Sequence, residues 1–343
     1  MNYGHSSSLL KSKKNVRNQI GDKNTNIFLK KGKEKRIFVS NNTLRKKRMQ
    51  IYVIIVSYNF MHWIDNCLGS LRLSSVPVCP IVIDNGSTDG TQAYLQSNYP
   101  EAIFIQNSEN AGFGKANNIG IKYALKKEFD FLYLLNQDAW IYPNTISLLI
   151  NTHKEHPEYG ILSPMQMNKG GLIFDKNFCQ RSLGRDAISD FFKGTKKNIY
   201  DTDSVMAAHW LIASDCIKKV GGFSPAFPHY GEDDNYQDRA RFFGFKVGIV
   251  PNSIAIHDRG DRKDDILKRA YIVYIHIIVN YCNINKKQKS SFIKTFLYAI
   301  PTIGKYVILA KSFTPIKYLV MLLRKRKSIK NAMMRSKDEG AFL

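Results

Sequence analysis

Two apolar segments of the chain end in polar residues whose types and spacing could hold a ligand. "VIDNGSTDG" (82–90) brings Asp84 and Asn85 directly after an apolar run, and Asp138 follows "FDFLYLLN" (129–136) by two residues. A buried carboxylate needs hydrogen-bond or metal partners, and its oxygens are ligands that hard cations such as Mg²⁺ prefer. Both features also have a structural interpretation, because Asn, Gly, Ser and Asp favour turns and an Asp can cap a following helix.

A third group of candidates lies further along the chain. Glu232, Asp233 and Asp234 are consecutive acids, and His257 closes the apolar run "VGIVPNSIAI" (247–256). A carboxylate beside a substrate hydroxyl can act as a general base, and a neutral imidazole is a common metal ligand. Acids at a helix start would also be explained by the helix dipole, and a histidine at a strand end by an ordinary hydrogen bond.

Alternating strands and helices would position these residues. The first run, "IYVIIVS" (51–57), is continuously apolar, which is typical of a parallel strand covered on both faces. We expect further strands at 80–84, 102–106 and 129–136, and helices at 61–73, after 87–91, at 114–127 and at 143–153. This alternation predicts an α/β fold with a doubly wound parallel sheet. Ligands of such sheets bind beyond the carboxyl ends of the strands, where Asp84 and Asp138 are expected.

Two common nucleotide-binding classes lack their motifs here. The position after the first strand reads "SYNFMHW" (57–63), without the glycines of a dinucleotide fingerprint. "GFGKAN" (112–117) has two of three such glycines but follows the third strand, and the chain contains no phosphate-binding loop of the G-x-x-x-x-G-K-[ST] type. An NAD enzyme and a P-loop enzyme are therefore poorly supported.

Five segments, taken in order, resemble the family 2 glycosyltransferases, which have the GT-A fold. They are "VIIVSYN" (53–59), "VIDNGSTDGT" (82–91), "NAGFGKANNIGI" (110–121), "LLNQDAW" (134–140) and "GGFSPAFPHYGEDDNYQDRARFFGFKVGIVPNSIAIH" (221–257). The resemblance implies a Rossmann-like, mostly parallel sheet flanked by helices. The segments 110–121 and "AAHWLIAS" (207–214) look most like the rhamnosyltransferase-type branch.

By this resemblance, the carboxyl ends of the strands bind a nucleoside-diphosphate sugar. Asp84 and Asn85 would face the base and ribose, although Asn85 stands where many members have a second Asp. The residues that the resemblance places around the donor are Ser57, Tyr58, Asn59, Asp84, Asn85, Gly112, Gly114, Asn117, Asn136, Gln137 and Asp138.

The resemblance also implies a metal site and a catalytic base. Asp138 and His257 would bind Mg²⁺ or Mn²⁺, with Asn136 standing where the family has its second metal-motif carboxylate. Asp233 would be the general base that deprotonates the acceptor hydroxyl, and the transfer would invert the anomeric configuration. Glu232 and Trp210 are expected on the acceptor side, although Trp210 fits the core equally well.

The function expected from these features is inverting, metal-dependent transfer of a sugar to a saccharide acceptor, on a lipid carrier, in bacterial surface polysaccharide synthesis. Two alternatives remain open at this point. One is a nucleic-acid-binding protein acting through basic tails, which no recognised motif supports. The other is a catalytically degenerate transferase serving as a scaffold, to which "NQD" (136–138) and Asn235 in place of a familiar Asp lend some support.

The charge of the chain is concentrated at its two ends. Residues 1–50 and residues 286–343 each hold 14 Lys and Arg against 2 acids, within a formal net charge of +23. We expect a basic disordered tail at 1–48, a catalytic domain at 49–265 and a basic amphipathic helical extension at 266–343. The five cysteines form no C-x-x-C pair, and no apolar run near the N-terminus resembles a signal peptide, which favours a cytoplasmic protein.

The C-terminal extension combines apolar segments with cations. "FIKTFLYAIPTIGKYVILAK" (292–311) is interrupted by Lys294, Pro301 and Lys305, and "YLVMLLRKRK" (318–327) ends in four cations. Such segments suit helices that lie in the interface of an anionic membrane rather than crossing it, or helices that pack on the catalytic domain. The first interpretation predicts peripheral attachment to the inner face of the plasma membrane, and that residues 286–343 are dispensable for donor hydrolysis.

Overall fold

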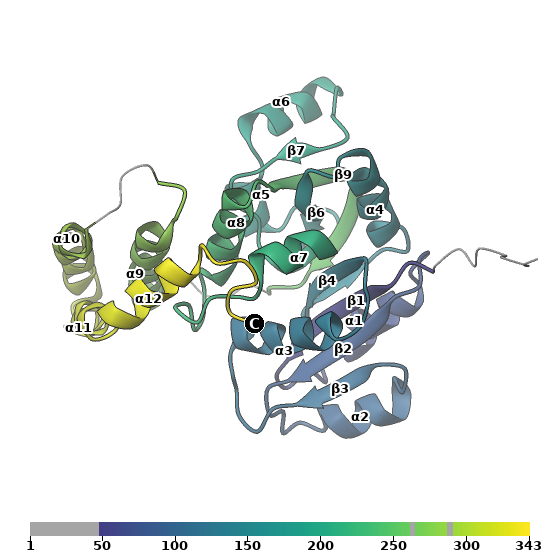
Figure 1. The fold of residues 1–343 in the computed structure, drawn as a ribbon, viewed down its shortest axis with the longest axis horizontal. Coiled ribbons are helices and arrows are strands. Elements are labelled where there is room, and N and C mark those ends of the chain that lie inside the picture. The colour runs from purple at the N-terminus through teal and green to yellow at the C-terminus, as the bar shows by residue number, and fades with distance from the viewer. Residues whose placement is uncertain (1–47, 261–264, 287–290) are drawn as a thin grey trace, which may run out of the picture. The chain divides into compact units, whose positions relative to one another are not determined.

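The central sheet is built around β1 (Ile51–Ser57), whose residues are almost all buried. β1 pairs in parallel with β2 (Cys79–Asp84) on one side and with β4 (Phe131–Asn136) on the other. β3 (Ile103–Gln106) extends the sheet in parallel beyond β2. The expected α/β arrangement is therefore confirmed, and the ends of β1, β2 and β4 lie at one edge (Figure 1).

The computed structural model describes residues 48–260, 265–286 and 291–343, and the described chain from Arg48 onward clusters as one unit. The basic tail expected at 1–48 therefore lies, apart from Arg48, outside the described residues.

Beyond β4 the sheet is mixed, which the alternation of strands and helices does not predict. β8 (His209–Ala213) runs antiparallel between β4 and β6 (Tyr159–Met167). β9 (Lys246–His257) is parallel to β6, and β5 (Ala139–Ile141) pairs antiparallel with the end of β9. The short β7 (Tyr200–Asp201) also pairs with β9. Ala139 lies opposite His257, so the turn after β4 and the end of β9 are brought together.

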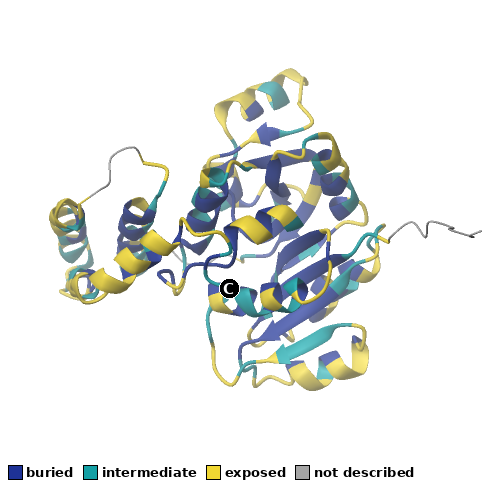
Figure 2. Cartoon of the chain, in the orientation of Figure 1, coloured by how far each residue is buried: buried dark blue, intermediate teal, exposed yellow. Residues whose placement is uncertain are grey.

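Helices cover the sheet and leave their outer faces exposed (Figure 2). α3 buries residues at helical spacing, including Ala116, Gly120 and Ala124. The helices before β9 are α1 (Ile64–Arg72), α2 (Thr91–Asn98), α3 (Phe113–Leu125), α4 (Thr145–Glu155), α5 (Lys176–Ser182), α6 (Arg185–Lys193), α7 (Ser214–Val220) and α8 (Glu232–Phe242).

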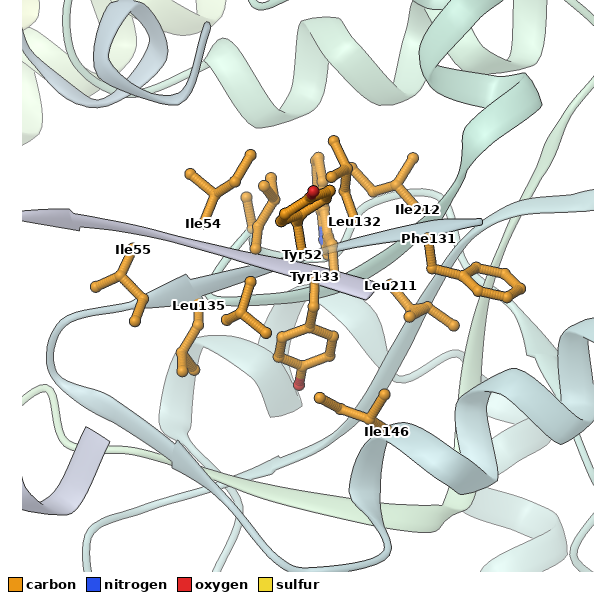
Figure 3. Close-up of a cluster of buried hydrophobic side chains, with 14 of the residues drawn as sticks. Tyr52, Ile54, Ile55, Phe131, Leu132, Tyr133, Leu135, Ile146, Leu211 and Ile212 are labelled. Atoms are coloured by element: carbon orange, nitrogen blue, oxygen red, sulfur yellow. The ribbon is translucent and has the colours of Figure 1, made fainter. Parts of the chain in front are cut away.

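The core lies on both faces of the sheet, because successive strand residues point to opposite sides. Figure 3 shows this in β1 and β4: Ile54 and Leu132 point to one side, and Tyr133 and Leu135 point to the other, toward Ile146 of α4. All five are almost completely buried. This packing fixes the strands whose ends carry the candidate site.

Among the described residues, four helices follow β9: α9 (Ile266–Cys282), α10 (Phe292–Ala310), α11 (Ile316–Arg324) and α12 (Arg326–Arg335). They share a second apolar core, which also takes in Ala226 and Phe227 from the loop before α8. α9 contacts α8 as well as α10 and α12 (Figure 1). Among the described helices, α10 is long and apolar enough to cross a membrane by length and composition, and only 17% of its most apolar window is buried.

The last residues of the chain contact α3, α8 and the segment between α7 and α8. The amide of Gly222 donates to Ala341 O at 2.8 Å, and Asn118 Nδ2 on α3 donates to Phe342 O at 3.3 Å. The Phe342 ring also lies 4.7 Å from the guanidinium of Arg239 on α8. The end of the chain is therefore part of the packing around α3 and α8, and the dispensability of residues 286–343 for donor hydrolysis stays a prediction.

Candidate active site

Asp84, at the end of β2, is buried and fully engaged by hydroxyl and amide donors. Ser57 Oγ donates to its Oδ1 at 2.8 Å, and Ser87 donates from its amide to Oδ2 at 2.8 Å and from its hydroxyl to Oδ1 at 2.5 Å. The carboxylate therefore ties the end of β1 to the loop after β2. This contact explains why an apolar strand ends in an acid. It fixes the ends of β1 and β2, beyond which a ligand would bind.

The loop after β1 is held by two further side chains. Asn59 has a φ of 50° and its Oδ1 accepts from the amide of Thr88 at 3.0 Å. Gln137 accepts from the amide of Tyr58 at 2.8 Å and donates to its carbonyl at 3.2 Å. Gln137 thus shapes the loop, while the side chain of Tyr58 remains 48% exposed and offers a ring face to a ligand.

Asn85 organises the neighbouring loop. It is buried, and its Oδ1 accepts from Asn107 Nδ2 at 2.9 Å and from the amide of Ala111 at 3.3 Å. The amide oxygen expected to face a base or ribose is therefore directed in this structure at the segment leading to α3.

The start of α3 lies against the segment that leads to α8. A Cβ at Gly112, whose φ is +77°, would stand 2.8 Å from Pro228 O, and one at Gly114 would stand 3.1 Å from Phe223 Cβ. Asn117 is buried one turn later, and its Nδ2 donates to Phe113 O at 3.0 Å. Gly112 and Gly114 therefore allow the close approach of α3 to the segment before α8, while Asn117 bonds within α3.

Asn136, Asp138 and His257 come together where β4 ends. Asp138 Oδ1 lies 3.5 Å from His257 Nε2, and Asn136 Nδ2 lies 3.5 Å from the same nitrogen. Asn136 Oδ1 is buried and has no hydrogen-bond partner in the described part of the chain. An unsatisfied amide oxygen beside a carboxylate and an imidazole is a donor set that fits Mg²⁺ or Mn²⁺. No group of three or more His, Cys, Asp and Glu gathers here or elsewhere among the described residues, so substrate oxygens would complete the coordination.

Cations that the sequence interpretation did not single out surround this cluster. Arg259 Nε lies 3.3 Å from His257 Nδ1 and 3.3 Å from Asp175 Oδ2 at the start of α5. Lys169 Nζ lies 3.0 Å from Asp258 Oδ2. The signal was present in "HDRG" (257–260), where a cation follows the histidine by two residues. Such groups can balance the charge of a diphosphate.

The acidic turn opens α8, and its carboxylates have different environments. Burial, and next the neighbouring Asp234, raise the pKa of Asp233 to about 6. Burial and the charge of Asp233 raise the pKa of Glu232 to about 8, and Glu232 Oε2 has no hydrogen-bond partner among the described residues. Asp234 forms an ion pair with Arg181 Nη2 at 2.8 Å. Above pH 6 the Asp233 carboxylate is therefore charged and can accept a proton, while Glu232 stays protonated up to about pH 8.

Trp210, expected on the acceptor side, lies in the core. Its ring is completely buried, stacked at 6.5 Å on Phe223 and tilted at 6.0 Å against Tyr236 of α8. It supports the helix that carries Asp233.

α5 connects the two halves of the site. Its N-cap Asp175 meets Arg259 beside His257, and its Arg181 meets Asp234 on α8. Six residues of helix span about 9 Å. The short helix α5 therefore contacts the candidate metal cluster at one end and the helix of the candidate base at the other.

Nearly half of the chain matches a known family. Residues 52–206 match the model described as glycosyl transferase family 2. An N-acetylglucosaminyl-diphospho-decaprenol L-rhamnosyltransferase of Mycobacterium tuberculosis is 26% identical over 233 residues, covering 60% of this chain and 75% of the relative. The low-salt glycan biosynthesis hexosyltransferase Agl10 of Haloferax volcanii is 25% identical over 213 residues, covering 60% of this chain and 66% of that protein.

Solved structures share the fold. The mannosyltransferase PcManGT of Pyrobaculum calidifontis, in complex with GDP-Man and Mn²⁺, superposes with a TM-score of 0.52 at 16% identity, covering 85% of this chain and 86% of that one. Residues 1–349 of TarS from S. aureus, in complex with UDP, give a TM-score of 0.51 at 14% identity, covering 84% and 81%. At such identities the likeness concerns the fold, and it confirms the GT-A architecture expected from the sequence.

Proposed function

Because this chain is a glycosyltransferase with a family 2 domain over residues 52–206, we propose that it transfers a sugar from a nucleoside-diphosphate sugar to a hydroxyl of a lipid-linked saccharide, with inversion and with a divalent cation. The observation that carries the proposal is the meeting of Asn136, Asp138 and His257 at the carboxyl ends of the strands, where Asn136 Oδ1 is buried without a hydrogen-bond partner among the described residues. The name of the Mycobacterium tuberculosis relative supports a lipid-diphosphate-linked acceptor.

The chemistry assigns separate tasks to the two ends of α5. Asp138, His257 and Asn136 would hold Mg²⁺ or Mn²⁺, which neutralises negative charge on the departing nucleoside diphosphate. Arg259 and Lys169 lie beside this cluster and would face the same diphosphate. The exposed ring of Tyr58 would pack on the base, above the loop that Asp84 fixes.

Proton transfer belongs to Asp233. As the acceptor oxygen attacks the anomeric carbon, its proton passes to the Asp233 carboxylate, and the bond from that carbon to the diphosphate oxygen breaks on the opposite face. A positioned base contributes typically about 10²–10⁴-fold to the rate. With a pKa of about 6, Asp233 is ionised at neutral pH.

We propose that the protein acts at the inner face of the plasma membrane, attached peripherally. α10, the turn after it (residues 311–315) and α11 expose large apolar side chains among cations, which fits a segment lying in an anionic interface. The most exposed of these side chains are Ile293, Leu297, Tyr298, Ile308 and Phe313. Their cationic neighbours are Lys294, Lys305, Lys311, Lys317, Arg324, Lys325, Arg326 and Lys327.

The test uses the purified full-length protein with a panel of dTDP-, UDP- and GDP-sugars, with Mn²⁺ or with EDTA. We expect one class of donor to be hydrolysed slowly without acceptor, only with metal, and transferred with inversion to a lipid-linked saccharide. A protein that binds none of the donors but binds nucleic acid would overturn the proposal. Binding of a donor without turnover under any condition would favour the scaffold.

A further inference from the structure

Arg181 joins two segments that are far apart in sequence at the start of the catalytic helix. Its Nη2 lies 2.8 Å and 2.9 Å from the two carboxylate oxygens of Asp234, and 3.1 Å from Ser204 Oγ. Ser204 Oγ in turn donates to Asp234 Oδ1 at 2.6 Å. Asp234 is thus held from two sides, by a cation on α5 and a hydroxyl from the segment before β8.

The neighbouring carboxylate depends on this arrangement. The amide of Asp234 donates to Asp233 Oδ1 at 2.9 Å, so fixing Asp234 also fixes one oxygen of Asp233. The charge of Asp234 raises the pKa of Asp233, whereas the charge of Arg181 lowers it. Arg181 therefore contributes both an orientation and an opposing charge.

We propose that Arg181 is a positioning residue for Asp233, which it holds at the first turn of α8 by binding Asp234 together with Ser204. The inference rests on the proposed role of Asp233 as base. It adds a residue from α5, which lies within the matched residues 52–206 but outside the five sequence segments that resemble the family. Arg181 itself need not touch either substrate.

The other charged or titratable groups around this turn do not replace Arg181. Glu232, Asp234 and Asp238 share the helix with Asp233, and each carries or can acquire negative charge; burial raises the pKa of Asp238 to about 6. From α9, burial lowers the pKa of His276, which faces Asp234 and Arg181, so His276 is neutral at pH 7. Tyr271 on α9 faces Glu232, and burial raises its pKa.

The remaining elements meet α8 further along. Cys216 of α7 faces Tyr236 and Arg239, and burial raises its pKa. β9 begins at Lys246, which lines a pocket of about 310 Å³ together with Arg241 near the end of α8 and with Arg181 itself.

The experiment is the pH dependence of kcat for Arg181→Gln, which removes the charge but keeps a hydrogen-bonding side chain. Without the cation, Asp233 holds its proton to higher pH. The acid limb of the profile should therefore move up by about one pH unit, which makes transfer on that limb about tenfold slower. The plateau at high pH should stay below the unmodified rate, because Asp234 and with it Asp233 are less well fixed, while donor affinity is unchanged.

Three matched variants separate positioning from stability. Arg181→Lys keeps the charge and should return the acid limb toward its original position. Ser204→Ala removes one hydrogen bond without a charge and should leave the limb in place. Asp234→Asn removes the like charge and should move the limb to lower pH. Thermal unfolding of each variant shows whether it is folded, and Asp234→Asn keeps the test decisive if Arg181→Gln is not.

The proposal is overturned if the limb of Arg181→Gln stays in place, if Ser204→Ala moves it equally far, or if Asp234→Asn moves it upward. Failure of the proposed function looks different. In that case Asp233→Asn would retain transfer at every pH, whatever the Arg181 variants do.

Discussion

Asp233 and Asp234 are adjacent carboxylates with different hydrogen-bond partners in this structure. Asp234 is occupied by Arg181 and Ser204, whereas Asp233 accepts a hydrogen bond from the amide of Asp234. Asp233→Asn should therefore lower kcat for transfer by about 10²–10⁴-fold and leave donor affinity nearly unchanged, because the lost charge serves proton removal. Steady-state kinetics with calorimetric donor binding check this. A dead Asp234→Asn beside an active Asp233→Asn would reverse the assignment.

The metal cluster gives a second prediction at the scale of single residues. Asp138→Ala and His257→Ala should each weaken Mn²⁺ binding in the presence of nucleoside diphosphate, and Asp138→Ala should weaken it more because it removes a formal charge. Calorimetry measures the Mn²⁺ affinity directly, and turnover is measured with EDTA. Asp215→Asn is the control, since this carboxylate is exposed on α7 and its loss should leave the Mn²⁺ affinity unchanged. Full activity of Asp138→Ala in EDTA would remove the metal from the mechanism.

Sequence interpretation identified the residues at strand ends but not what each one does. Asp84, Asn85 and Gln137 all lie at the expected edge, yet their polar atoms bind neighbouring loops. Local sequence cannot distinguish a side chain that holds a ligand from one that shapes the loop around it. Arg181 was missed for a related reason, because its contact with Asp234 joins residues 53 positions apart and leaves no local pattern.

At the scale of elements, α8, which carries the proposed base Asp233, is fixed at its start by α9. Gly231, the N-cap of α8, has a φ of 80°, and a Cβ there would stand 2.6 Å from Ile275 Cγ2 and 2.8 Å from Val279 Cγ2 of α9. Gly231→Ala should cost at least about 1–2 kcal/mol in the free energy of unfolding from the left-handed backbone alone. It should also lower kcat, because α8 must move away from α9.

The matched control for this variant is a glycine in α10, the helix that packs on α9. Gly304 lies in the interior of α10, and the space that a methyl group would take there is open to 4 Å within the described part of the chain. Gly304→Ala should therefore be neutral or stabilise the protein by up to about 1 kcal/mol. Chemical denaturation of both variants, with transfer assays, checks the pair. Equal stability and activity of Gly231→Ala and the unmodified protein would show that α9 does not constrain the catalytic helix.

The elements themselves were predictable where local patterns are strong. β1 to β4 and the long helix α10 follow the expected ranges closely, because continuous apolar runs and helical periodicity are visible in single segments. β5, β7 and β8 were not foreseen. Each is short and runs antiparallel, and each forms only through pairing with β4, β6 or β9.

At the scale of the whole described chain, the C-terminal helices form a core of their own, and the residues after α12 contact the segment between α7 and α8. The second apolar core joins α9 to α12, and the final residues bond to Gly222 and to Asn118 on α3. Removing the extension would therefore also remove contacts to the segment between α7 and α8. For this reason, single substitutions on the exposed face test the membrane proposal better than a deletion does.

Ile308 and Phe313 are the substitutions of choice, since 78% and 79% of their surfaces are exposed beside Lys305 and Lys311. Burying one large apolar side chain is worth about 1.5–3 kcal/mol, and each basic residue near an anionic surface about 1 kcal/mol. Changing Ile308 and Phe313 together to Asp should thus weaken attachment to anionic liposomes at least tenfold. Attachment of the unmodified protein should fall at high salt without vanishing, because the apolar part is insensitive to salt.

Flotation of the full-length protein with anionic and with neutral liposomes measures this. Phe192→Asp is the matched control: that side chain is 94% exposed but lies on α6, outside the extension, so its loss should leave flotation unchanged. If the unmodified protein stays at the bottom of the gradient at low salt, the apolar face of α10 and α11 does not bind membranes. If Phe192→Asp reduces flotation as much as the double variant does, attachment is not specific to that face. Under the proposed function, attachment through α10 would bring the first turn of α8 near a lipid-linked acceptor, because α10 packs on α9 and α9 packs on α8.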